Sequence, residues 1–347
     1  MSIRIGIAND VRLATEVLKK IVEADTRMQV VWTAIDGVEA IQYCGEQPVD
    51  LVLMDLKMPN MDGVEATRRI MARSPCPILI VTSTIDGHLD MVYEALGHGA
   101  LDVTTTPVVG DKRIADSGQA LQRKIVALCK DYKSAGTATS GDTADVPSQC
   151  KLDQTGPPVM LIGASTGGPA IIMEILKALP ANFPAAIIIA QHIDPNFVEG
   201  LAEWLASHSK NPVKLAEDGE RLAVGTIYVA ASDRNLVMVE DDKLEYTDDA
   251  KGSFYKPCIN ALFASAAIHI GRGSAAVLLT GMGSDGAEGL LSLKKAGIAT
   301  VAQDEQSCVV YGMPRAAAAL GAAALIAAPD DISDFLIHKF MGISRNG

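Results

Sequence analysis

The sequence predicts an α/β protein of two domains, each with a mostly parallel sheet covered by helices on both faces. Short apolar runs typical of strands alternate with helical patterns, aliphatic residues are abundant while aromatic residues make up only 4%, and one stretch of small and polar residues interrupts the alternation. Strands buried on both faces appear in sequence as continuous apolar runs. The 347 residues suffice for two cores of ordinary size.

The first domain, residues 1–132, consists of five strand and helix units. Candidate strands are residues 4–8, 29–34, 51–54, 78–82 and 101–105, and helical patterns follow from residues 12, 37, 64, 88 and 113. A strand, a crossover and a parallel strand, repeated in this way, make a flavodoxin-like (βα)5 sheet. We therefore expect functional residues at the carboxyl ends of these strands.

Residues 133–157 separate the two domains, and residues 158–347 form the second. The separating segment is rich in Ser, Ala, Gly, Thr, Asp and Pro, so it cannot bury a core and is predicted to be a flexible linker. Beyond it, apolar runs at 159–163, 186–191, 275–280 and 299–303 predict a doubly wound, mostly parallel sheet. The apolar run 316–328 is too short to span a bilayer and predicts a buried helix followed by a strand.

Charge and cysteine content exclude several function classes. A formal net charge of -12 argues against binding of nucleic acid or of an anionic membrane surface. The six cysteines are scattered without metal-ligand spacing and are expected to be reduced thiols. The N-terminus has a strand pattern and no secretory leader, so we expect a cytoplasmic protein without direct membrane insertion.

Two carboxylates follow neighbouring strands of the first domain. Asp10 comes after the first candidate strand and Asp55 after the third. Paired acids at adjacent strand ends can hold Mg²⁺ through oxygen ligands. For either residue alone, a helix cap or turn is the more common explanation, and the occurrence of the pair favours the metal site.

Three sharp turns in the second domain each follow an apolar strand and carry Ser165, His192 and Asp285. Parallel strands bring such turns to one crevice, where hydroxyl, imidazole and carboxylate make a serine-hydrolase triad. The string Gly-Ala-Ser165-Thr-Gly also fits a nucleophile elbow. We expect the backbone N–H groups of Thr166 and Met282 to be the oxyanion donors. The glycine-rich turn could equally hold an anion, which would make this domain a non-catalytic binding module controlled by the first domain.

A dinucleotide-dependent oxidoreductase is the other alternative. Gly281, Gly283 and Gly286 match Gly-x-Gly-x-x-Gly between a strand and a helix, and Asp304 follows at about the distance of a ribose contact. The late position of this turn counts against the alternative, because a dinucleotide site usually opens its domain. It would also leave Ser165 and His192 unexplained.

The first domain resembles a response-regulator receiver domain, on the string Met-Asp55-Leu-Lys-Met-Pro. This resemblance implies that a histidine kinase phosphorylates Asp55, that Thr82 contacts the phosphoryl group, and that Mg²⁺ binds Asp10, Asp55 and the backbone carbonyl of Lys57. Three positions depart from the family pattern: Asn9 replaces an acid, Thr106 a lysine and Val103 an aromatic residue. Asn9 takes one formal charge from the metal site, so we expect weakened magnesium binding. Thr106 removes a charge-assisted contact to the phosphoryl group.

The second domain resembles the catalytic domain of the chemotaxis protein-glutamate methylesterase (CheB) family. Matching strings are Ile-Gly-Ala-Ser165-Thr-Gly-Gly-Pro, Gln-His192, Leu-Thr-Gly-Met-Gly-Ser-Asp285-Gly-Ala and Ala-Gln-Asp-Glu-Gln-Ser-Cys-Val-Val-Tyr311. The resemblance implies a cofactor-free hydrolase of a two-component system that removes methyl groups from glutamate esters of methyl-accepting chemoreceptors and deamidates receptor glutamines.

Some positions depart from the methylesterase pattern or suggest a subfamily. Ile193-Asp194 replaces a usual Met-Pro, and Ala264 replaces a frequent arginine. His98 and the string Thr104-Thr-Thr-Pro resemble a subfamily that serves a non-flagellar, surface-sensing array. These departures concern the choice of receptor more than the chemistry.

Overall fold

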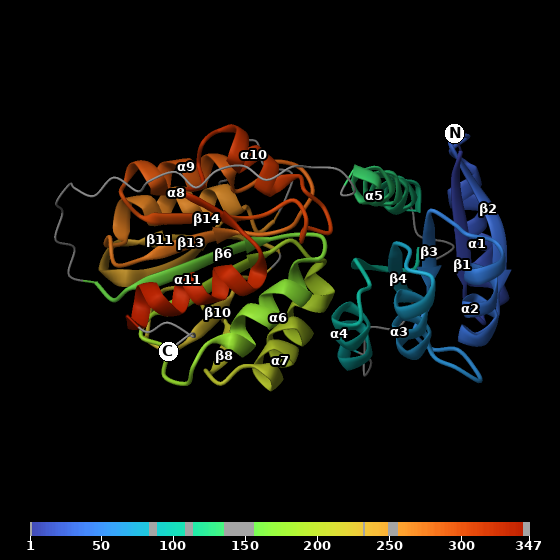
Figure 1. The fold of residues 1–347 in the computed structure, drawn as a ribbon, viewed down its shortest axis with the longest axis horizontal. Helices are drawn as coiled ribbons and strands as arrows, with labels where there is room; N and C mark the ends of the chain where they lie inside the picture. Colours follow the sequence, from blue (N-terminus) through green and yellow to red (C-terminus); the bar gives the residue numbers. More distant parts are fainter. Residues whose placement is uncertain are drawn as a thin grey trace. The chain divides into compact units, whose positions relative to one another are not determined.

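The computed structural model describes residues 2–82, 89–107, 114–134, 156–231, 233–248 and 256–342 (Figure 1). It divides into two compact units, Met1–Ser134 and Ala135–Gly347. Most of the predicted linker, residues 135–155, lies outside the described residues. So do the predicted helix starts at residues 88 and 113. Each unit is described by itself below.

The first unit is a five-stranded parallel sheet in the order β2-β1-β3-β4-β5. This confirms the flavodoxin-like (βα)5 prediction. In chain order the elements are β1 (Ile3–Ala8), α1 (Arg12–Glu23), β2 (Met28–Ala34), α2 (Gly37–Glu46), β3 (Leu51–Met54), α3 (Gly63–Arg73), β4 (Ile78–Thr82), α4 (Leu89–Gly97), β5 (Asp102–Thr105) and α5 (Ile114–Ser134).

Local sequence explains how α3 comes to lie directly beside Asp55. Asp62 caps α3 by accepting a hydrogen bond from the backbone N–H of Glu65 at 2.8 Å. The N–H of Gly63 donates to the carbonyl of Leu56 at 2.8 Å. A side chain at Gly63 would bring its Cβ within 2.1 Å of the Asp55 carbonyl oxygen, so only glycine fits there. The loop after β3 is thereby held in one conformation.

The second unit contains a seven-stranded parallel sheet in the order β15-β14-β13-β6-β7-β10-β8. This confirms the doubly wound, mostly parallel prediction. Strands and helices of this layer are β6 (Val159–Ala164), α6 (Gly168–Ala178), β7 (Ala186–Gln191), α7 (Val198–His208), β8 (Val213–Leu215), β10 (Ile227–Val229), α8 (Ile259–His269), β13 (Ala275–Leu278), α9 (Ala287–Lys295), β14 (Ala299–Gln303), α10 (Met313–Ala319), β15 (Leu325–Ala327) and α11 (Pro329–Met341).

Helices cover both faces of this sheet, with α6, α7 and α11 packed together on one side and α8, α9 and α10 on the other (Figure 1). The apolar run 316–328 becomes the end of α10 followed by β15, as predicted. No helix in the described parts of the chain is long and apolar enough to cross a membrane.

A small antiparallel sheet, in the order β11-β12-β9, was not predicted from the sequence. It consists of β9 (Glu220–Arg221), β11 (Asn235–Val239) and β12 (Lys243–Thr247), and the short 3-10 turn η2 (Glu240–Asp242) joins β11 to β12. Another 3-10 turn, η1 (Pro195–Phe197), lies between β7 and α7. The buried side chains Leu236, Met238 and Leu244 join the core formed around α8 and α9. The sheet therefore extends the hydrophobic core on the α8 side of the unit.

The direction of strand progression reverses between β6 and β13. From β6 the chain moves through β7 and β10 toward one edge, while β13, β14 and β15 lead to the other edge. In open parallel sheets such a reversal leaves a crevice at the carboxyl ends of the two strands, where ligands bind. The turns after β6 and β13 are the ones that carry Ser165 and Asp285.

Candidate functional site

Ser165 directly follows β6 and lies in a tightly packed turn. Its backbone N–H donates to the Thr280 carbonyl at 3.0 Å, which ties the turn after β6 to the one after β13. A Cβ on Gly281 would come within 2.6 Å of the Ser165 Cβ, so this approach requires glycine. Gly167 adopts a φ of 76°, which allows α6 to start immediately afterwards. The serine is largely buried, with 8% of the residue exposed.

His192 follows β7 and is held to the serine turn by backbone contacts. Its N–H donates to the Ala164 carbonyl at 2.9 Å. The buried Gln191 side chain donates from Nε2 to the carbonyls of Ser165 at 2.8 Å and of His192 at 2.9 Å. Gln191 therefore joins the two turns. Its position before the histidine is visible in the sequence, but nothing there shows that its amide spans both carbonyls.

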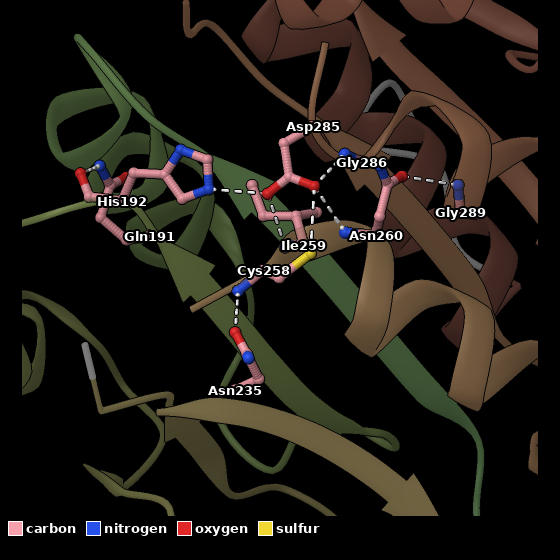
Figure 2. A network of polar contacts seen from close by, with 9 residues as sticks. All are labelled: Gln191, His192, Asn235, Cys258, Ile259, Asn260, Asp285, Gly286 and Gly289. Atoms are coloured by element: carbon pink, nitrogen blue, oxygen red, sulfur yellow. Dashed lines mark hydrogen bonds and ion pairs between the residues drawn. The ribbon is translucent and has the colours of Figure 1, made fainter. Parts of the chain in front are cut away.

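The imidazole of His192 contacts Asp285, which follows β13 (Figure 2). Its Nε2 lies 2.9 Å from Oδ2 of Asp285, and both side chains are 7% exposed. The three predicted residues thus come from three separate turns at one edge of the sheet. With Nε2 directed to the carboxylate, Nδ1 is the ring nitrogen on the opposite side from Asp285.

Asp285 is also bound to the start of α8 (Figure 2). Oδ2 accepts from the Ile259 N–H at 2.8 Å, and Oδ1 accepts from the N–H of Asn260 at 2.9 Å. The Cys258 thiol lies 3.5 Å from Oδ1, and the N–H of Gly286 donates to the same oxygen at 2.9 Å. Nothing in the sequence indicated that α8 supports the carboxylate, because the start of α8 is distant in the chain from each of the three turns.

The environment keeps Asp285 ionised. Burial acts to raise its pKa, but the hydrogen bond and charge of His192, together with the N–H groups of Asn260 and Ile259, outweigh burial and leave the pKa below its ordinary value of 3.8. A carboxylate that remains charged throughout the neutral range can orient an imidazole and stabilise its protonated form.

The turns that carry Thr166 and Met282 flank Ser165. The Thr280 hydroxyl donates to the Thr166 carbonyl at 3.0 Å and accepts from the N–H of Val310 at 2.9 Å. Gly281 pairs with Tyr311, so the segment after β14 supports the turn after β13. Thr166 is buried and Met282 partly buried. Their predicted role as oxyanion donors remains a prediction.

The residues singled out for dinucleotide binding have structural tasks of their own. Gly283 and Gly286 have positive φ angles of 84° and 86° in the turn that delivers Asp285. Asp304 accepts hydrogen bonds from the N–H of Ser307 at 2.9 Å and from its hydroxyl, so its carboxylate is engaged within its own turn.

In the first unit, Asp55 is buried at the carboxyl end of β3. The Asn9 amide donates to its Oδ2 at 3.0 Å and the Leu56 N–H to its Oδ1 at 2.8 Å. Burial is the main cause that raises the pKa of Asp55 to about 6; the charge of Asp10 raises it further, while N–H groups of Leu56 and Lys57 oppose the change.

The other predicted pocket residues lie at neighbouring strand ends. Asp10 is exposed after β1 and Thr82 is buried at the end of β4. Thr106 is buried after β5, and within the described residues its hydroxyl has no hydrogen-bond partner. Those residues also contain no cluster of three or more His, Cys, Asp or Glu side chains that could hold a metal ion. A cation here would depend on two carboxylates and a backbone carbonyl.

Comparison with known proteins covers both units. Residues 160–336 match the CheB methylesterase model and residues 5–116 the response regulator receiver domain model. The chain is 44% identical to protein-glutamate methylesterase/protein-glutamine glutaminase 3 of Pseudomonas aeruginosa, over 97% of this chain and 99% of that protein. It is 43% identical to protein-glutamate methylesterase/protein-glutamine glutaminase 1 of Bordetella avium, over 97% of each.

A solved structure supports the same assignment. The crystal structure of the CheB methylesterase catalytic domain of Thermotoga maritima is 35% identical in sequence and matches with a TM-score of 0.51. The match covers 53% of this chain and 99% of the solved one. Since a relative of over 30% identity matches nearly the whole chain, the protein is an enzyme of the CheB methylesterase family, with a response-regulator receiver domain preceding its catalytic domain.

Proposed function

We propose that this protein hydrolyses glutamate methyl esters on the signalling part of methyl-accepting chemoreceptors and deamidates receptor glutamines. Ser165 is the nucleophile, His192 the general base and acid, and Asp285 the orienting carboxylate. The observation that carries this proposal is the 2.9 Å contact between His192 Nε2 and Asp285 Oδ2, beside a serine on the neighbouring turn of a topological switch point.

The chemistry follows from these positions. Ser165 Oγ attacks the ester carbonyl while the imidazole takes its proton, and the ionised Asp285 stabilises the imidazolium that forms. Collapse of the tetrahedral intermediate breaks the bond to the methoxy oxygen, which leaves as methanol with the proton from His192. His192 then takes a proton from a water molecule that attacks the acyl-enzyme and passes this proton to the departing Ser165 Oγ, which releases the receptor with a glutamate side chain. A glutamine substrate follows the same route and releases ammonia.

The developing oxyanion needs donors close to Ser165. We assign this role to the backbone N–H groups of Thr166 and Met282, which lie on the two turns that meet at the serine. The close approach of Gly281 to Ser165 supports this assignment, because it brings the turn that carries Met282 against the serine turn. This chemistry requires no cofactor.

Regulation is assigned to the receiver domain. Asp55 accepts a phosphoryl group from the histidine kinase of a chemosensory array, and Thr82 contacts that group. Asp10, Asp55 and the Lys57 carbonyl fit Mg²⁺, because all are oxygen donors and the two carboxylates are close enough for the charge of Asp10 to raise the pKa of Asp55. Mg²⁺ would offset negative charge during phosphoryl transfer. Asn9 contributes an amide where a further carboxylate would strengthen metal binding.

This function implies a cytoplasmic location, where receptor signalling domains and kinases are found. We further propose that the array is a non-flagellar, surface-sensing one. The first experiment measures methanol release from a methylated receptor fragment by wild type, Ser165→Ala and Asp55→Asn, with and without a small phosphodonor. We expect release to vanish in Ser165→Ala and to respond to phosphodonor only when Asp55 is present. A wild type without release would contradict the esterase and favour a binding module.

A further inference from the structure

The helices α8 and α9 begin next to each other at Asp285, and neither is capped by the side chain of its own N-cap residue (Figure 2). Cys258 is the N-cap residue of α8 and makes no side-chain cap, and Gly286 at the start of α9 has no side chain. The first N–H groups of a helix have no partner within the helix. Both helices therefore need acceptors from elsewhere.

Each helix obtains its acceptor from the other one. Asp285, just before α9, accepts from the first two N–H groups of α8, those of Ile259 and Asn260, at 2.8 and 2.9 Å. Asn260, in the first turn of α8, accepts from the Gly289 N–H of α9 through its side-chain Oδ1 at 2.8 Å. The two helix starts are thus capped reciprocally, and the acceptor on one side is the carboxylate that contacts His192.

Close packing makes this arrangement stiff. A Cβ on Gly289 would lie 2.6 Å from the Cβ of Phe263 and 3.0 Å from the carbonyl oxygen of Asn260. The first turn of α9 therefore rests directly against the backbone of α8. Since Asp285 immediately precedes the N-cap residue of α9, any displacement of this first turn moves the carboxylate relative to His192.

We propose that Asn260 is a positioning residue for Asp285, which it holds in reach of His192 by capping α9. The role rests on the proposed function, because it concerns the orientation of the same triad. Without the Asn260 side-chain oxygen, the Gly289 N–H has no acceptor and the start of α9 can shift. Catalytic geometry tolerates only about 0.5 Å of displacement before activity falls.

The test compares three variants of the full-length protein. Asn260→Leu has a similar size but lacks the acceptor, and Asn260→Asp keeps an oxygen at the same place. Asn211→Ala is the matched control: Asn211 is likewise an asparagine whose Oδ1 accepts from a backbone N–H, that of Phe183 at 3.0 Å, but it lies between α7 and β8. Its loss costs stability without touching the triad.

We expect Asn260→Leu to lower kcat for methanol release about 10- to 100-fold with little change in KM, as for a misplaced catalytic group. Asn260→Asp should recover most of the loss, and Asn211→Ala should keep kcat even if its Tm falls. The proton shared by His192 Nε2 and Asp285, observed downfield in the proton spectrum at acidic pH, should shift or broaden in Asn260→Leu only.

Two results would overturn the proposal. One is an Asn260→Leu variant with unchanged kcat and an unchanged downfield proton. The other is equal loss of activity in Asn260→Leu and Asn260→Asp, which would mean that the capping oxygen is not what matters. If wild type itself releases no methanol, the proposed function fails, but the downfield proton still reports whether Asn260 holds Asp285 against His192.

Discussion

Two buried aspartates follow parallel strands in this protein, and their surroundings shift the pKa values of the two carboxyl groups in opposite directions. Asp285 receives N–H groups from the start of α8 and contacts His192, and its pKa lies below the ordinary value. Asp55 receives the Asn9 amide and the N–H groups of Leu56 and Lys57, but it is buried and faces the charge of Asp10, and its pKa rises to about 6. Position at a strand end is shared; the donors around each carboxylate are not.

The comparison indicates that the Asp285 carboxylate in the second unit has a fixed charge, whereas the charge of Asp55 in the first unit is adjustable. A carboxylate already surrounded by donors keeps its ionised state and serves as a permanent partner for an imidazole. A carboxylate that is buried beside another acid gains most from a cation or from covalent modification. The predictions below test this difference, from the largest expected effect to the smallest.

Removal of the nucleophile should have the largest effect. Ser165→Ala is expected to lower kcat for methanol release by up to about 10⁶-fold, as in other enzymes whose triad acts as a unit. Steady-state rates on a methylated receptor fragment measure this, and labelling of wild type by a fluorophosphonate checks that the serine is activated. A loss of less than about 100-fold would argue against Ser165 as the nucleophile.

Neutralising the fixed charge of Asp285 should have the second-largest effect on activity. Asp285→Asn is expected to lower kcat by about 10⁴-fold, because the amide no longer favours the required imidazole tautomer. The folded-state pKa of Asp285 is below the ordinary value of 3.8, so its charge stabilises the fold above about pH 4 and this contribution is lost as the pH falls through the lowered pKa.

Denaturant unfolding of wild type and Asp285→Asn across pH measures that linkage. The difference in unfolding free energy should be constant near neutral pH and shrink under acidic conditions. A difference that grows on acidification would contradict the assignment of a lowered pKa to Asp285.

Disconnecting the serine and histidine turns should have a smaller effect. Gln191→Leu removes the amide that donates to the carbonyls of Ser165 and His192. We expect a fall in kcat of about 10-fold and a loss of about 1–3 kcal/mol in unfolding free energy, since two buried acceptors lose their donor. Kinetics and denaturant unfolding measure these, and Gln42→Leu on the exposed side of α2 in the receiver is the control. Unchanged kinetics would show that the backbone alone holds both turns.

Magnesium binding at Asp55, the adjustable charge, should have the smallest effect. Millimolar Mg²⁺ is expected to raise the Tm of wild type, because a cation that binds only the folded state stabilises it by mass action. Asp55→Asn should abolish this increase, while Asp285→Asn, whose carboxylate is saturated by protein donors, should keep it. Thermal unfolding with and without EDTA measures the effect. An equal Mg²⁺ response in Asp55→Asn and wild type would place the ion elsewhere.

Much of the architecture could be predicted because strand and helix signals are local. The runs 51–54, 78–82, 186–191 and 299–303 became β3, β4, β7 and β14 with the predicted bounds. The run 275–280 was predicted too long, since β13 ends at Leu278 and Thr280 instead bonds across to Gln303, Thr166 and Val310. The antiparallel sheet was missed because its strands are short, two to five residues each, and such short segments carry only a weak strand signal in the sequence.

The sequence by itself determined the two α/β units, the strand ends that carry Asp55, Ser165, His192 and Asp285, and the resemblance to a receiver joined to a methylesterase. These properties depend on apolar periodicity and on turn residues, which act within a few neighbours along the chain. Only the tertiary structure decided that Asp285 and Asn260 cap each other's helices, and that Asp55 is buried with the charge of Asp10 acting on it in addition to its hydrogen-bond donors. Such contacts join residues distant in the sequence, and the free helix ends and buried charges that require them exist only once the elements have packed.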